Sequence, residues 1–189
     1  MYKKKRIAKE QLEFMVEIGS VLLLIVAVFT GIWYSFYIEE KDAQTFTVLY
    51  TWLSQGSSNI DIIGFSYLVL KSMKKLIFIW LCGWLGFTSP LGWILVFIVI
   101  FSYSFTTTTV ILLLGESGIF TVLFTYGVQA ILCVSIGLVL LKKSVLFLWG
   151  KSEKEKKVYA KMLIPIVIIS VIVSLVDIVI MNNLQNIIK

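Results

Sequence analysis

The chain has 189 residues, of which 59% are hydrophobic and 15% are charged, and its mean hydropathy is +0.94. A soluble domain usually carries about 25% charged residues, so this composition excludes a soluble globular protein and indicates a single membrane domain. The net charge of +6 comes from basic residues beside apolar runs, not from a polar face with interleaved aromatics. It therefore predicts no nucleic-acid binding.

The residue types present exclude most catalytic and metal sites. The chain has no histidine, which removes Ser-His pairs, Cys-His pairs and histidine-based zinc sites. It contains no G-x-x-x-x-G-K-[ST] phosphate loop, so it is not itself an ATPase. Its two cysteines, Cys82 and Cys133, lie inside apolar runs and indicate neither a disulfide framework nor a zinc site. We therefore expect no enzyme, no bound metal and no cofactor.

Apolar runs along the chain predict an all-α, polytopic membrane protein with about five transmembrane helices. A basic cytoplasmic segment, 1–17, leads into a first span that is too long for the apolar region of a cleaved signal peptide. The predicted spans are 18–37, 76–88, 93–114, 119–141 and 163–181, joined by an outer loop at 38–75 and a cytoplasmic loop at 142–162, with an outer tail at 182–189.

The second span is short, and it crosses a bilayer only if it extends backwards, with Lys71, Lys74 and Lys75 reaching for the interface. Charge predicts the orientation, because cytoplasmic loops near spans are enriched in Lys and Arg. Five spans place the basic segments 3–9 and 142–161 both inside and the C-terminus outside. Four spans would put the second of these segments outside.

Two polar regions are expected to lie along the membrane surfaces. The outer loop 38–75 has apolar residues at helical spacing and a polar break at 56–59, which predicts short interfacial helices. Most of the six tryptophans lie near predicted span ends, as interfacial anchors do. The cytoplasmic loop is predicted to touch the anionic inner leaflet through Lys142, Lys143, Trp149, Lys151, Lys154, Lys156 and Lys157.

Polar side chains recur on one face of the third span and of the fifth. Such residues let helices approach closely and form hydrogen bonds across a helix pair; alternatively, they line a path for a solute. Asp177 is a functional candidate because a carboxylate inside a membrane is costly, and Lys74 or Lys75 is its expected partner. Its place near the outer end also fits an interfacial carboxylate. The two faces are Ser102, Thr106 and Thr109, and Ser170, Ser174 and Asp177.

Small residues predict helix contacts in two other spans. The fourth span carries Gly127 and Gln129, and then Cys133 and Gly137 at the small-xxx-small spacing that lets backbones approach. Ala27 and Gly31 have the same spacing in the first span. Such faces could also join copies of the chain into a homo-oligomer, an alternative that the sequence does not decide.

The order of these parts resembles the stage II sporulation protein M family of bacterial membrane proteins. The resemblance is carried by the stretch 70–141, in which the helix ending at 86–92, the turn at 115–118 and the segment 126–129 fall where the family has its G-x-P-L turn, glycine turn and Pro-Gln-Asn segment. In that last segment Val128 and Ala130 replace the proline and the asparagine around Gln129. The third span also lacks the glycines usual in the family.

The resemblance implies a non-catalytic scaffold in the cell membrane that anchors or recruits peptidoglycan hydrolases, the stage II sporulation proteins D and P, during engulfment of the forespore. The outer loop 38–75 and the tail 182–189 would then present the partner-binding surface. The alternative is a permease subunit of an ABC-type exporter, driven by a separate ATPase that docks on 142–161. In that case the two polar faces would line the transport path.

Overall fold

The computed structural model describes residues 2–41, 62–84, 89–116, 119, 122–150 and 153–188, and every regular element within these ranges is helical. Its helices are α1 (Tyr2–Lys41), α3 (Ile62–Trp84), α4 (Ser89–Leu114), the π-helical turn η2 (Leu123–Gly127), α6 (Val128–Gly150), α7 (Glu153–Lys161) and α8 (Leu163–Ile188).

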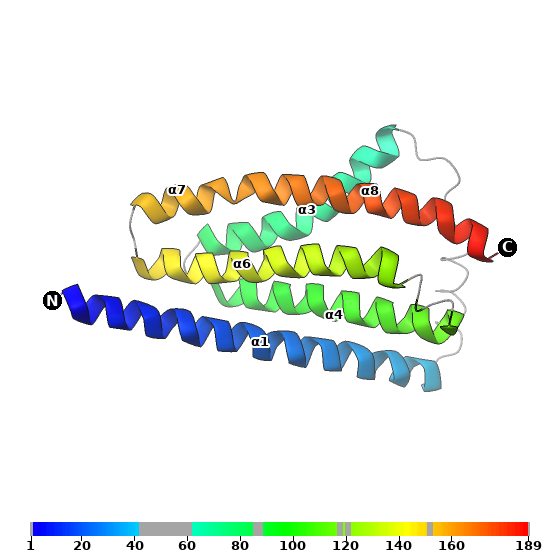
Figure 1. The fold of residues 1–189 in the computed structure, drawn as a ribbon, viewed down its shortest axis with the longest axis horizontal. Coiled ribbons are helices and arrows are strands. Elements are labelled where there is room, and N and C mark those ends of the chain that lie inside the picture. The colour runs from blue at the N-terminus through cyan, green and yellow to red at the C-terminus, as the bar shows by residue number, and fades with distance from the viewer. Residues whose placement is uncertain are drawn as a thin grey trace.

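The helices lie side by side and run alternately in opposite directions along the bundle (Figure 1). Only a turn at Met162 separates α7 from α8, and the two follow one another in nearly the same direction (Figure 1). The described helices therefore make five passes, and the two chain termini lie at opposite ends of the bundle.

Four helical stretches in the described part of the chain are long and apolar enough to cross a membrane, namely Glu10–Glu39, Pro90–Leu113, Val128–Phe147 and Lys156–Val176. The remaining pass is α3, which has 23 residues. Every 18-residue stretch of α3 contains Lys71, Lys74 and Lys75, so its charge, and not its length, separates it from the other four.

Several predicted boundaries are corrected by the helix ends. Residues 62–75, expected in interfacial helices of the outer loop, belong to α3, which continues to Trp84. The predicted cytoplasmic loop 142–162 is largely helical, because α6 continues to Gly150 and α7 follows. Hydropathy marks where a helix leaves the apolar layer, whereas a helix ends where its backbone is broken. The glycines of these two segments lie at helix ends, Gly64 in the first turn of α3 and Gly150 at the end of α6, and lysine, a good helix former, interrupts neither helix. The predicted break at 56–59 lies outside the described residues.

Local sequence signals explain several helix ends. Both prolines of the chain, Pro90 and Pro165, lie in the first turn of a helix, where the missing N–H would have no intrahelical acceptor. Gly115 follows α4 with a φ of 59°, and its N–H donates to the Ile111 carbonyl at 2.9 Å. A left-handed residue just after a helix is a common C-cap that glycine adopts without strain.

The buried core lies along the centre of the bundle, where α3, α4, α6 and α8 meet. Leu76, Val96, Leu140 and Ile166 are almost fully buried there. Large apolar side chains such as Phe29 and Ile98 are exposed on the outer surface. This distribution fits a bundle whose outer face contacts lipid, because lipid does not force apolar side chains inward.

Candidate functional site

A strip of small residues on α1 forms the contact between α1 and α4. Ala27, Gly31 and Ser35 are spaced four residues apart and are all buried. A Cβ atom on Gly31 would lie 2.8 Å from the Ser104 Cβ and 2.9 Å from the Phe101 carbonyl oxygen. The two backbones are therefore close enough at this point to exclude any side chain, as the small-xxx-small spacing predicts.

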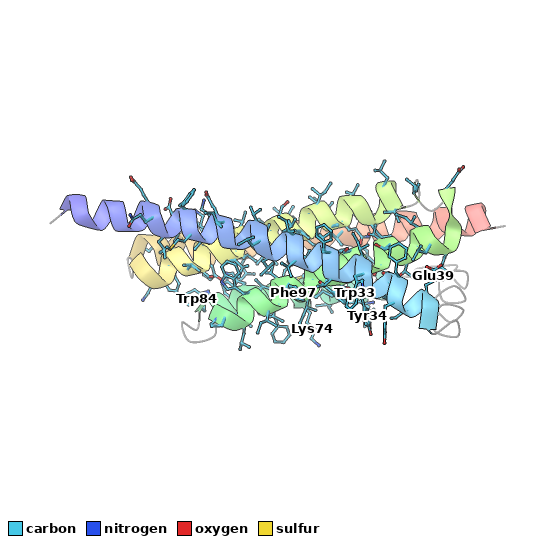
Figure 2. The ribbon with its side chains drawn as sticks, turned by 90° about the horizontal axis from the view of Figure 1, so that it is seen from below. Trp33, Tyr34, Glu39, Lys74, Trp84 and Phe97 are labelled. Atoms are coloured by element: carbon cyan, nitrogen blue, oxygen red, sulfur yellow. The ribbon has the colours of Figure 1, made fainter. Side chains whose placement is uncertain are left out.

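Hydroxyl groups join the same two helices. Ser104 Oγ donates to the Val28 carbonyl oxygen at 2.9 Å. Ser35 Oγ lies 3.0 Å from the Phe105 carbonyl oxygen and 3.3 Å from Thr109 Oγ1. On the outer side of this contact, the rings of Tyr34 and Phe105 lie 5.8 Å apart (Figure 2 labels Tyr34). These polar groups stabilise the helix pair, since each is satisfied within the bundle.

The three residues predicted on one face of the third span have different surroundings. Thr109 is buried against α1. Thr106 donates to the carbonyl oxygen of Ser102 on its own helix at 2.8 Å, and both residues are half-buried. The three residues share one side of α4, as their spacing predicts, but of the three only Thr109 is buried. Ser104, which the prediction left out, also bonds directly to α1.

The predicted face of the fifth span packs on α3. Ser170 and Ser174 are fully buried, and Ser72 Oγ lies 3.2 Å from the Ser170 carbonyl oxygen and 3.4 Å from Ser174 Oγ. Ser174 donates to the Ser170 carbonyl oxygen at 2.8 Å. Among the described side chains, Ser170 Oγ is buried without a hydrogen-bond partner.

Asp177 belongs to α8, but its side chain is not among those described. Because α3 and α8 run in opposite directions (Figure 1), Asp177 and Lys74 lie on opposite sides of the contact between Ser72 and Ser174 along the bundle. The predicted pairing of Asp177 with Lys74 or Lys75 stays a prediction.

The predicted residues of the fourth span lie in η2 and α6. Gln129 and Cys133 are buried, and Gly127 is half-buried at the end of η2. Gly137 is buried against α4, where an added Cβ would lie 3.5 Å from Val96 Cγ2. That distance is ordinary van der Waals contact, so Gly137 sits in a looser contact than Gly31.

An aromatic cluster around Tyr159 holds α7 onto the bundle. Tyr159 is 1% exposed, and its ring stacks on Trp80 and Phe147 at centroid distances of 6.1 and 5.7 Å. Its hydroxyl donates to the Trp80 carbonyl oxygen at 2.9 Å, and Trp80 Nε1 donates back to the Tyr159 carbonyl oxygen at 3.1 Å. Gly83 makes room for this side chain, because a Cβ there would lie 2.6 Å from Tyr159 Cζ.

Sequence reasoning missed this cluster. The segment 151–161 is rich in lysine and glutamate, so its single tyrosine did not stand out from a surface tract. Trp80 and Trp84 were interpreted as interfacial anchors, although their spacing of four residues on one helix face was the available signal. Trp84 is exposed at one end of the bundle and contacts Tyr159 edge-on (Figure 2).

The predicted inner-leaflet residues are spread over two helices at that end of the bundle. Lys142 forms an ion pair with Glu17 of α1, and Lys143 is half-buried. Lys156 and Lys157 are exposed on α7. The side chains of Trp149, Lys151 and Lys154 lie outside the described residues. Contact of this surface with lipid headgroups stays a prediction.

No group of three His, Cys, Asp or Glu side chains that could hold a metal ion occurs among the residues that the structure describes. Comparison with family models, curated proteins and solved structures finds no significant match. The class follows from the helices themselves. The described residues are helical and include four stretches long and apolar enough to cross a membrane, which by length and composition makes the chain a multi-pass membrane protein.

Proposed function

We propose that the chain is a non-catalytic membrane scaffold, similar to stage II sporulation protein M, that anchors or recruits peptidoglycan hydrolases of the D and P type during engulfment. The five passes would place the N-terminus and the α6–α7 end in the cytoplasm and the C-terminus outside. Partners would bind at the outer end, on the predicted outer loop and the tail 182–189.

The observation that supports a scaffold over a transporter is the use of the hydroxyl groups. Ser35, Ser104 and Thr109 form the α1–α4 contact, and Ser170 and Ser174 are buried against α3. A solute path requires polar groups that face an opening, whereas these face neighbouring helices. A bundle whose polar side chains are used in contacts between its own helices suits a protein that holds others in place.

Affinity purification of the tagged full chain from membranes tests the scaffold proposal. A wall hydrolase should co-purify with the intact chain and be lost when residues 42–61 are replaced by a Gly/Ser linker of equal length. A matched control replaces exposed Lys156 and Lys157 on α7 by serine, which should leave capture unchanged because these residues lie at the other end of the bundle. If no hydrolase co-purifies, or if the linker variant captures it equally well, the scaffold proposal fails.

The second proposal is a permease subunit driven by a separate ATPase. It is supported by α7, a short helix that Tyr159 fixes rigidly to α3 and α6 while Lys156, Lys157 and Lys161 stay exposed. A rigid, exposed helix at the cytoplasmic end could transmit a push from an ATPase. Replacing Asp177 by Asn should abolish export under this proposal, and it should leave hydrolase capture unchanged under the first.

A further inference from the structure

The helix α3 carries charge where most of the other passes carry none. Lys71, Lys74 and Lys75 lie near the middle of its 23 residues, and all three are exposed on the surface of the bundle. A charged group held in hydrocarbon is costly and is normally paired with an opposite charge. An anionic partner for one of these lysines would therefore lower the cost of placing α3 in a membrane. Most of the other four passes consists of stretches without Asp, Glu, Lys or Arg, namely 18–38, 89–115, 117–141 and 162–176.

The contact between α3 and α8 brings a carboxylate to the level of these lysines. Ser72 Oγ of α3 lies 3.4 Å from Ser174 Oγ of α8, and the two helices run in opposite directions (Figure 1). Asp177, three residues beyond Ser174 on α8, is therefore level with Val69, three residues before Ser72 on α3. Lys71 is two residues from that level, which is about 3 Å along the bundle.

Helical geometry also places Lys71 and Asp177 on the same side of this contact. Successive residues turn by about 100° around a helix, so Lys71 lies about 100° from Ser72, and Asp177 lies about 60° from Ser174. In two antiparallel right-handed helices, these two rotations lead to the same side of the contact. Lys74 lies about 160° from Ser72 on the far side of α3, and in Figure 2 it points away from the other helices.

Of the three lysines, Lys71 is therefore the best placed for Asp177. Lys75 lies on the same side of the contact, but it is about 9 Å from the level of Asp177, three times the offset of Lys71. The headgroup layer is a poor alternative, because Lys71 is nine residues from Ile62 at the start of α3, about 13 Å along the helix. A lysine side chain extends only about 6 Å, which is enough to reach a neighbouring helix but not the end of its own.

We propose that Lys71 of α3 and Asp177 of α8 form an ion pair inside the membrane, and that this pair fixes α3 to α8. The partner of Asp177 is then Lys71, and not Lys74 or Lys75 as the sequence alone suggested. The lysines separate α3 from the four stretches that are apolar enough to cross a membrane, and the pair lowers the cost of crossing for this fifth helix. The inference depends on the bundle lying in a membrane and on neither proposed function.

Zero-length crosslinking of the full chain in native membranes tests the pair directly. A membrane-permeable carbodiimide activates a carboxyl group, and an amine in contact with it displaces the urea to form an amide. Mass spectrometry of the digested chain should show a link between Lys71 and Asp177. Lys71→Gln should remove this link, whereas the matched control Lys74→Gln should keep it. The pair is refuted if Asp177 links only to another lysine or another protein, or reacts with the carbodiimide without linking to Lys71.

Thermal unfolding of the full chain gives an independent test by charge exchange. Asp177→Asn and Lys71→Gln should each lower the midpoint by at least about 2 °C while the chain still folds, and the double variant should lose no more than the worse single variant. Lys71→Asp combined with Asp177→Lys should recover most of the loss that either reversal causes alone. Lys74→Asp combined with Asp177→Lys should recover none. Additive losses, or equal recovery by the Lys74 exchange, would contradict the pair.

Discussion

Alanine at Gly31 should loosen the α1–α4 contact, whereas alanine at Gly137 should not. Both glycines lie inside helices at small-xxx-small positions, so their spacing in the sequence does not distinguish them. The structure does. A Cβ on Gly31 meets the Phe101 carbonyl oxygen at 2.9 Å and the Phe105 nitrogen at 3.0 Å, and these backbone atoms cannot rotate away. A Cβ on Gly137 meets only side-chain atoms of Val96, at 3.5 Å and beyond.

The magnitude follows from the distances. Moving the Ser104 Cβ from 2.8 Å to a normal contact of about 3.5 Å separates the helices by roughly 0.7 Å. That shift weakens the bonds from Ser104 to Val28 and from Ser35 to Phe105, each contributing about 0.6 kcal/mol in a membrane protein. Overpacking adds about 1–3 kcal/mol, so the total cost is about 2–4 kcal/mol.

Alanine also gains about 1 kcal/mol over glycine inside a helix, which leaves a net loss of roughly 1–3 kcal/mol for Gly31→Ala. Gly137→Ala keeps the gain without the clash and should be neutral or slightly stabilising. The difference between the two variants, about 2–4 kcal/mol, cancels helix propensity. Reversible unfolding of the full chain in mixed micelles, followed by tryptophan fluorescence, measures it. Equal stability of the two variants would refute the close backbone approach.

Three further changes probe the α7 end of the bundle. Tyr159→Phe removes the bond to the Trp80 carbonyl oxygen and should lower the free energy of unfolding by about 1 kcal/mol; a neutral result in the same assay would contradict a direct bond. Gly83→Ala should cost at least about 2 kcal/mol by displacing Tyr159, and limited proteolysis should then cut near α7; full protection would count against the packing. Glu17→Gln and Lys142→Gln, alone and together in a double-mutant cycle, should give a coupling free energy of unfolding of at most about 1 kcal/mol. This coupling should fall with added salt, since both side chains are well exposed. A coupling that does not depend on salt would indicate a desolvated pair.

Composition and periodicity are sufficient to predict the helical membrane class, because an excess of apolar residues in long runs has few other structural solutions. They are less informative about helix ends. The helix α3 continues through Lys71, Lys74 and Lys75 because lysine is a good helix former, while a hydropathy profile treats the same residues as the end of a span.

The candidate site was predictable only in part. The spacing of Ala27 and Gly31 marks a contact surface but not its partner, since any neighbouring helix could occupy it. The three residues of the predicted strip on α4 differ in their bonds, because Thr109 lies within hydrogen-bond distance of Ser35 on α1 whereas Thr106 donates to Ser102 of its own helix. The burial of Tyr159 depends on the absence of a side chain at Gly83, a long-range match between two helices that no local pattern contains.

The side of the membrane reached by each end of the bundle is the most direct test of the five-pass arrangement. In a chain whose cysteines at 82 and 133 are replaced by alanine, single cysteines at Lys156 and Gln185 can be labelled in intact cells with a maleimide that does not cross membranes. We predict that Gln185→Cys is labelled from outside and that Lys156→Cys reacts only after permeabilisation. The reverse pattern would contradict the proposed orientation, because it would arise if α3 did not cross the membrane or if the whole bundle were inverted.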